Sequence, residues 1–309
     1  MKTERFTLAS PVDGLPLNVL LATPVDGEIK GVIQIAHGMC EYIDRYEGAM
    51  KTLTGLGYAV AGNDHRGHGR SVRDEADLGW FYDKDGGAII EDTAALTAYL
   101  KERFPQKPLT LFGHSMGSMV ARVYLQKYDT MLDGVVLCGA PPKNPLSGIA
   151  VFLADMVSAF KGERHRSGML RGLSVGVYDK KFSGEGTNAW LSVDKGNVER
   201  YNADPLCDYT FTCNGFRNLF CLLRNTFRGK EYQVQKPTLP IFFIAGADDP
   251  VIGDKEQLLA SAEFLRSVGY QTVETKVYDG VRHEILNEAI ADTVLQDVDN
   301  FLCGIFVGV

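Results

Sequence analysis

The chain of 309 residues lacks the features that would assign it to several other classes of protein. No stretch approaches the ~18 consecutive apolar residues of a membrane span. Residues 1–5 lead into mixed polar sequence and not into the apolar centre of a secretory signal. Positive charge is not in excess, because 32 lysines and arginines are outnumbered by 39 acidic residues, for a net charge of −7. We therefore expect a cytoplasmic protein without a nucleic-acid partner.

The cysteines lack the spacings that metal centres and redox motifs require. The chain contains six of them, and no two form a C-x-x-C pair. Free, buried thiols are the expected state in a chain without a secretory signal. We predict no metal site and no cofactor.

What the sequence does contain is an alternation of short apolar runs and amphipathic segments. A hairpin is predicted over 5–23. Further strands are predicted at 31–36, 58–62, 109–113, 135–138, 241–245 and 272–278, and helices at 42–56, 86–104, 115–128, 255–268 and 284–302. Several of these strands show no polar alternation, which is typical of strands buried on both faces of a parallel sheet. The predicted fold class is α/β, a mostly parallel twisted sheet flanked by helices.

The alternation is interrupted once, between two proline-containing joints. The first joint is Pro141-Pro142 and the second is Lys236-Pro237. The residues between them are too many for a loop of a compact domain. We predict that residues 141–236 form a mostly helical cap, inserted into a core whose two parts are 1–140 and 237–309.

The motif with the clearest chemical meaning is Gly113-His114-Ser115-Met116-Gly117. It follows an apolar run and precedes a segment with apolar residues at helical spacing. A strand, a sharp turn and a helix in this order are typical of a nucleophile elbow, where a serine hydroxyl stands clear of the sheet at the positive end of a helix. We interpret Ser115 as a catalytic nucleophile, and the alternative is a glycine-rich connection with a chance serine.

A serine nucleophile needs a general base, an orienting acid and a hole for the oxyanion. Of the six histidines, only His283 lies beyond every strand predicted after the serine, in a turn before the last helix. The preceding strand-end loop offers two adjacent acids, Asp248 and Asp249, of which one can point into the site. The backbone N–H groups of Met116, beside the nucleophile, and of Met39, after an earlier strand, are the expected oxyanion donors.

Several separate stretches resemble the monoacylglycerol lipase and lysophospholipase-like branch of the α/β-hydrolases, of the serine aminopeptidase S33 type. Residues 37–46 resemble its H-G-x-x-E-x-x-x-R-Y, 64–71 its D-x-R-G-x-G-x-S, 113–117 its G-H-S-M-G and 246–251 its G-x-x-D-x-V. The resemblance implies an α/β-hydrolase fold and a triad in which Asp249 is the acid. It also implies Ser115 as nucleophile and His283 as base. The oxyanion donors that it implies are again the N–H groups of Met39 and Met116. Short segments of 141–236 also resemble the caps of bacterial members.

These observations predict a serine hydrolase that cleaves carboxylic esters through an acyl-enzyme. The resemblance implies substrates like monoacylglycerols or lysophospholipids. Two other catalytic functions stay open, a carboxylesterase for small esters and an S33-type peptidase that cleaves amide or aminoacyl bonds. A non-catalytic ligand-binding receptor is a further alternative, which an intact set of catalytic residues disfavours.

Weaker expectations concern the cap and two loops. Apolar residues in 149–160 and 216–223 could line an acyl tunnel, pack in an ordinary core or form a dimer interface. The basic residues of 161–171 could meet an anionic membrane surface or lie in solvent, so transient membrane contact through the cap stays open. Glu41 and Arg45 could form an ion pair that holds the oxyanion loop or could lie on a solvated helix face. Loop 64–71, with two histidines, is interpreted as a structural turn rather than a metal site.

Overall fold

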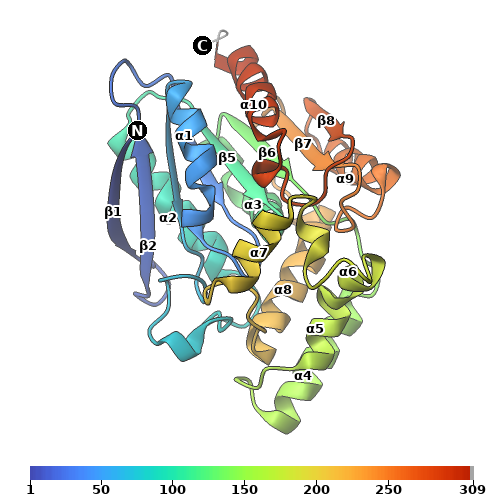
Figure 1. Ribbon diagram of the computed structural model, residues 1–309. Coiled ribbons are helices and arrows are strands. Elements are labelled where there is room, and N and C mark those ends of the chain that lie inside the picture. Colours follow the sequence, from blue (N-terminus) through green and yellow to red (C-terminus); the bar gives the residue numbers. More distant parts are fainter. Residues whose placement is uncertain (307–309) are drawn as a thin grey trace.

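A computed structural model describes residues 1–306, and its centre is a sheet of eight strands in the order β1-β2-β4-β3-β5-β6-β7-β8 (Figure 1). The first two strands pair antiparallel as the predicted hairpin, β2 pairs antiparallel with β4, and all other neighbours are parallel. The strands are β1 (Lys2–Ala9), β2 (Pro16–Thr23), β3 (Gly31–Ala36), β4 (Tyr58–Asn63), β5 (Leu109–His114), β6 (Gly134–Cys138), β7 (Ile241–Gly246) and β8 (Val273–Tyr278). The prediction of a mostly parallel α/β sheet is confirmed.

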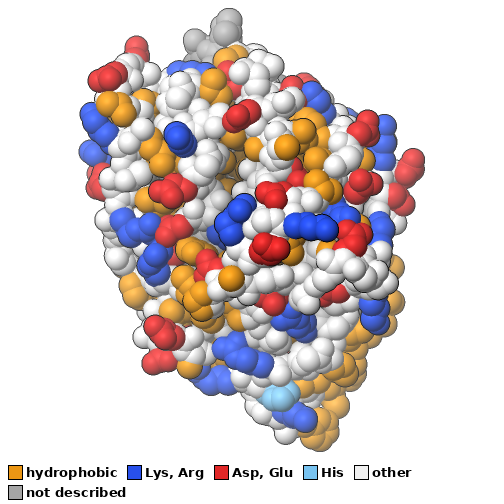
Figure 2. All heavy atoms as spheres, in the orientation of Figure 1, with side chains coloured by type: hydrophobic (Ala, Val, Ile, Leu, Met, Phe, Trp, Pro, Cys, Tyr) orange, Lys and Arg blue, Asp and Glu red, His pale blue; other side chains and the backbone are white. Residues whose placement is uncertain are grey.

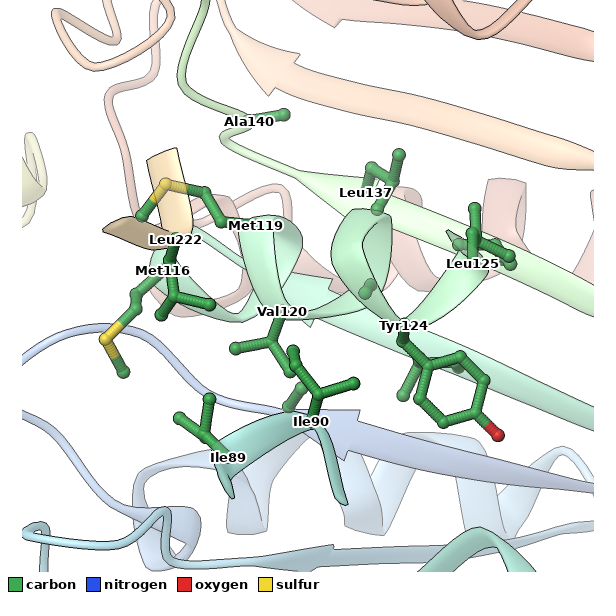
Figure 3. Packing of buried hydrophobic residues seen from close by; sticks show 14 of the residues in the cluster. Ile89, Ile90, Met116, Met119, Val120, Tyr124, Leu125, Leu137, Ala140 and Leu222 are labelled. Carbon is green, nitrogen blue, oxygen red and sulfur yellow. The ribbon is translucent and has the colours of Figure 1, made fainter. Parts of the chain in front are cut away.

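Helices cover both faces of this sheet, which explains why its central strands are buried along their whole length. On one face lie α2 (Ala88–Arg103), α3 (Met116–Tyr128) and α9 (Lys255–Ser267), and on the other lie α1 (Glu47–Gly55) and α10 (Ala291–Phe306). Neighbouring strand residues alternate between the two hydrophobic clusters: Leu111 belongs to one and Phe112 to the other. Figure 3 shows Val120 of α3 packed against Ile89 and Ile90 of α2.

Between β6 and β7 the chain forms five helices that gather beside one end of the sheet (Figure 1). They are α4 (Ser147–Lys161), α5 (Gly168–Ser174), α6 (Gly176–Lys181), α7 (Lys195–Ala203) and α8 (Cys213–Thr226). The last of them, α8, packs on α3, the helix that follows the nucleophile motif. These helices lie in the segment for which a cap was predicted. The cap boundaries at 141 and 236 stay a prediction.

The start of the last helix was predicted wrongly. The sequence pattern placed it at residue 284, but α10 begins at Ala291, after a single 3-10 turn at Ile285–Asn287. The side chain of Glu288 accepts hydrogen bonds from the backbone N–H groups of Val193 and Arg282, and its own backbone is extended. This contact with the cap holds the loop out of helical geometry.

Two further observations concern the whole described chain. Within residues 1–306, no helix combines the length and the apolar character needed to cross a bilayer. All six cysteines are free, five of them buried and Cys303 half-buried, as expected for reduced thiols.

Candidate active site

Ser115 stands at the turn between β5 and α3. Its backbone has φ +53° and ψ −115°, a conformation that an L-residue rarely adopts and that is typical of a strained nucleophile elbow. The turn is tight because side chains are missing on both sides. A Cβ at Gly113 would meet the backbone of Gly117, and one at Gly117 would meet the backbone of Ala36. The predicted strand, turn and helix are all present.

His283 and Asp249 come together from two strand-end loops. The imidazole Nδ1 donates to Asp249 Oδ2 at 2.8 Å, and both side chains are buried. The other carboxylate oxygen of Asp249 accepts the Val251 N–H at 2.8 Å, which fixes its orientation. The neighbouring Asp248 is exposed to solvent. Of the two adjacent acids, Asp249 is therefore the one that bonds the histidine.

One contact of this pair was not predicted. Gly139, directly after β6, has φ +58°, and a Cβ built there would lie 2.8 Å from His283 Cε1 and 3.2 Å from Asp249 Oδ2. Only a residue without a side chain leaves room for the pair and adopts this backbone conformation without strain. The available signal in the sequence was a glycine at the end of a buried strand, next to the first proline joint.

Ser115 and His283 both line a cavity of about 220 Å³ between core and cap. The predicted oxyanion donors Met39 and Met116 line it as well. Many of the other lining side chains are apolar. From the core and α8 these are Met119, Leu219, Phe220 and Leu223, and from the remaining cap Ala150, Leu173, Val175 and Val177. The predicted apolar cap segments are therefore divided: some residues face the cavity, whereas Phe216 and Leu222 are buried in the core.

The loop that carries Met39 is held by the buried carboxylate of Glu41. Its Oε1 accepts the Gly38 N–H at 2.5 Å, the Tyr46 hydroxyl at 2.8 Å and His114 Nδ1 at 3.1 Å. Glu41 thus joins the residue before Met39 to the residue before Ser115. This arrangement orients the two chain segments that supply the predicted oxyanion donors.

His114 is buried between this carboxylate and the loop of His283. Its Nδ1 faces Glu41, and its Nε2 lies 3.3 Å from the backbone oxygen of His283. Only an imidazolium donates from both nitrogens at once. Burial opposes that charge, but the hydrogen bond and the charge of Glu41 outweigh it and raise the pKa of His114. Burial likewise opposes ionisation of Glu41, yet His114 and Arg45 hold its pKa below the usual value.

Arg45 extends the network to the cap. Its guanidinium binds both carboxylate oxygens of Glu284, at 2.6 and 2.8 Å, and it also binds Glu41 at 3.1 Å. Asn197 of α7 donates to Glu284 at 2.7 Å. Burial disfavours the charge on Glu284, but Arg45 more than compensates and lowers the pKa of that carboxyl. The predicted Glu41–Arg45 pair is present, and the role of Glu284, next to His283, was missed.

The histidine-rich loop 64–71 is a structural support. His37 Nε2 accepts the His65 N–H at 2.8 Å, which ties this loop to the Met39 loop. Arg66 is fully buried and bonds Asp92 at 2.7 Å. Among the described residues, no group of three or more histidines, cysteines or acids is placed to hold a metal ion. The hydrogen bond of His65 and the ion pair of Arg66 agree with the interpretation of this loop as a structural turn.

The sheet order, the elbow and the inserted helices define an α/β-hydrolase fold. The chain belongs to the serine aminopeptidase S33 family, whose model matches residues 27–290. It is 26% identical to a monoacylglycerol lipase of Mycolicibacterium smegmatis over 90% of this chain and 89% of the relative. It is also 26% identical to the monoglyceride lipase of Homo sapiens, over 88% and 82% of the two chains. A carboxyl esterase from Bacillus coagulans, crystallised with glycerol, superposes with a TM-score of 0.88 at 27% identity, over 99% of each chain.

Proposed function

We propose that this protein is a serine hydrolase that cleaves carboxylic esters, with Ser115 as nucleophile, His283 as general base and Asp249 as orienting acid. The observation that carries the proposal is the 2.8 Å bond between His283 Nδ1 and Asp249 Oδ2 beside a cavity that Ser115 also lines. Because Nδ1 donates to the carboxylate, Nε2 is the nitrogen left to accept the hydroxyl proton. The names of the relatives, lipases and esterases, favour ester over amide substrates.

The reaction proceeds in two acyl transfers. Ser115 Oγ attacks the ester carbonyl while His283 takes its proton, and Asp249 stabilises the imidazolium. The oxyanion is received by the N–H groups of Met39 and Met116, and loss of one such donor typically costs about 10²–10³ in turnover. The imidazolium then protonates the departing alcohol, and a water molecule hydrolyses the acyl-enzyme by the reverse sequence of proton transfers. No metal or cofactor takes part in these steps.

The acyl half of the substrate is an aliphatic chain. Its binding site is the apolar wall formed by side chains such as Met119, Leu219 and Leu223. Esters like monoacylglycerols or lysophospholipids combine such a chain with a polar alcohol. We also propose a cytoplasmic location, supported by the six unpaired cysteines.

Substrates of this kind reside in lipid surfaces, and we propose that α4 contacts such a surface. Ile149, Phe152, Met156 and Phe160 follow a helical spacing and are exposed, Phe160 to 81%. Figure 2 shows apolar side chains gathered at the lower edge of the molecule, where Figure 1 has α4. The apolar stripe supplies the contact. Two of the nearby basic residues are paired within the protein, Arg164 with Asp77 and Arg171 with Asp208.

Membrane contact is tested with the double variant Phe152→Ser/Phe160→Ser in flotation assays on phosphatidylcholine vesicles. We expect weaker flotation than for the unmodified protein, with unchanged hydrolysis of a water-soluble ester. Equal flotation of the two proteins would contradict the proposed contact.

The proposed reaction is tested with a series of p-nitrophenyl esters from acetyl to palmitoyl. We expect a maximum at medium or long chains and a loss of about 10⁶ in kcat for Ser115→Ala. A maximum at acetyl would indicate a small-ester carboxylesterase. Activity that survives the substitution would overturn the assignment of the nucleophile. If no ester is hydrolysed and a fluorophosphonate does not label Ser115, the alternative of a non-catalytic ligand-binding receptor is favoured.

A further inference from the structure

A short segment of the cap is anchored on both sides of His283. Arg282 Nη1 donates to the backbone oxygen of Ala189 at 2.7 Å. The backbone N–H of Glu284 donates to the backbone oxygen of Leu191 at 2.8 Å. The cap residue between these two anchors is therefore held against the histidine itself.

That cap residue is Trp190. Its ring centroid lies 5.2 Å from that of His283, and the two planes meet at 42°. Tyr178 supports the indole, with a ring separation of 5.2 Å. Trp190 lines the cavity together with Ser115 and is only 7% exposed.

The indole nitrogen of Trp190 is a buried donor without an acceptor. Among residues 1–306, no atom accepts a hydrogen bond from Nε1. Buried polar groups are nearly always hydrogen-bonded in folded proteins, because an unpaired donor has lost its water without compensation. Trp190 lines the cavity, and its Nε1 is buried from solvent, so a ligand oxygen binds this donor once the indole shifts toward the cavity.

We propose that Trp190 is a specificity-determining residue that binds the leaving alcohol of the substrate. The proposal rests on the proposed function, in which His283 protonates the alcohol oxygen as it departs. Because Trp190 faces His283, the atoms it reaches belong to the alcohol half of the ester. An indole N–H only donates, so it selects an alcohol that carries a further oxygen acceptor. A hydroxyl of a polyol and a phosphate oxygen of a phosphodiester both have this chemistry.

The test compares three decanoate esters that differ only in the alcohol: 1-propanol, glycerol and glycerophosphocholine. The variant is Trp190→Phe, which keeps an aromatic ring over His283 and removes the donor. We expect the ratio of kcat/KM for an oxygen-bearing ester to kcat/KM for the propyl ester to fall about 3- to 10-fold. The ester whose ratio falls, glycerol or glycerophosphocholine, identifies the source of the acceptor.

The matched control is Trp80→Phe. Trp80 is the other tryptophan of the chain, and it lies under the guanidinium of Arg164 outside the cavity. This variant should leave both ratios unchanged. If Trp190→Phe also leaves both ratios unchanged, or lowers all three rates equally, the proposal is overturned. Failure of the proposed function has a different signature, namely hydrolysis of all three esters that survives Ser115→Ala.

A second readout does not depend on turnover. The sample is ¹⁵N-labelled Ser115→Ala protein. The indole N–H resonance of Trp190 is the one that is missing from the spectrum of the double variant Ser115→Ala/Trp190→Phe. Glyceryl decanoate should shift the Trp190 resonance and leave the Trp80 resonance in place. Propyl decanoate should shift the Trp190 resonance less than glyceryl decanoate does. Equal shifts of the Trp190 signal with the two esters would count against a hydrogen bond to the alcohol.

Discussion

A single methyl group at Gly139 should disable the proposed catalytic pair of His283 and Asp249 while leaving the fold in place. The added Cβ would lie 2.8 Å from His283 Cε1 and 2.9 Å from its Nδ1, closer than real Cβ atoms approach other atoms. The imidazole must therefore move away from Gly139. Its 2.8 Å bond to Asp249 cannot be kept at the same geometry after that movement.

The size of the effect follows from two separate costs. A side chain at φ +58° costs about 1–2 kcal/mol of folding free energy, because the left-handed region is unfavourable for L-residues. Displacement of a catalytic group by about 1 Å typically costs 10²-fold in rate, and loss of the orienting acid costs about 10⁴-fold. We expect Gly139→Ala to lower kcat/KM by about 10²- to 10⁴-fold and the free energy of unfolding by only about 1–2 kcal/mol.

The matched control is Gly280→Ala. Gly280 has a similar backbone conformation, φ +72°, but nothing lies within 4 Å of its Cβ position. This variant should show the same loss of stability and near-normal kcat/KM. Hydrolysis of p-nitrophenyl butyrate and unfolding in urea measure the two quantities. Unchanged activity in Gly139→Ala, or an equal loss in Gly280→Ala, would refute the steric argument.

Three further predictions concern the network and the cavity. Arg45→Met leaves Glu284 and Glu41 buried without their cation, so the free energy of unfolding measured in urea should fall by about 3–5 kcal/mol. Adding Glu284→Gln to this variant should restore part of the lost stability. No restoration would contradict the pairing. Because the folded-state pKa of Glu284 is lowered, its stabilisation is complete above about pH 4.3 and is lost as pH falls. Glu284→Gln should therefore flatten the decline of Tm below that pH in calorimetry, and a slope equal to wild type would exclude this contribution. Leu223→Trp fills part of the cavity beside the apolar wall, so kcat/KM should fall more for decanoyl esters than for acetyl esters. An unchanged chain-length profile would show that Leu223 is not part of the acyl site.

The buried network has a consequence for how the cap and the catalytic loop move. Arg45 contacts the carboxylate next to His283, the carboxylate that holds the Met39 loop, and Asn197 of the cap. A displacement of α7 would therefore separate buried charges from their partners, which is strongly unfavourable. In contrast, α4 carries exposed apolar residues. The part of the cap that contains Asn197 is thus bound to the catalytic loop, whereas α4 packs on α8.

Much of the fold could be predicted from local sequence because the relevant physics is local. Continuous apolar runs such as those of β6 and β7 indicate strands covered on both faces, and the structure buries every residue of both. The nucleophile elbow was equally accessible, since a small residue two positions on either side of Ser115 is a local steric requirement. The placement of the acid and the histidine in strand-end loops was accessible as well, because open α/β sheets carry their sites there.

Other features were decided only by tertiary contacts between distant parts of the chain. Two adjacent aspartates look alike by local chemistry, and only the family resemblance favoured Asp249. In the structure, burial of Asp249 against His283, 34 residues away, distinguishes them. Gly139 meets the same pair across the sheet edge, and the start of α10 depends on contacts with the cap. The packing of Trp190 on His283 likewise requires the cap to dock on the core. Propensity and spacing act over a few residues, whereas these contacts exist only once strand ends and an inserted cap have been brought together.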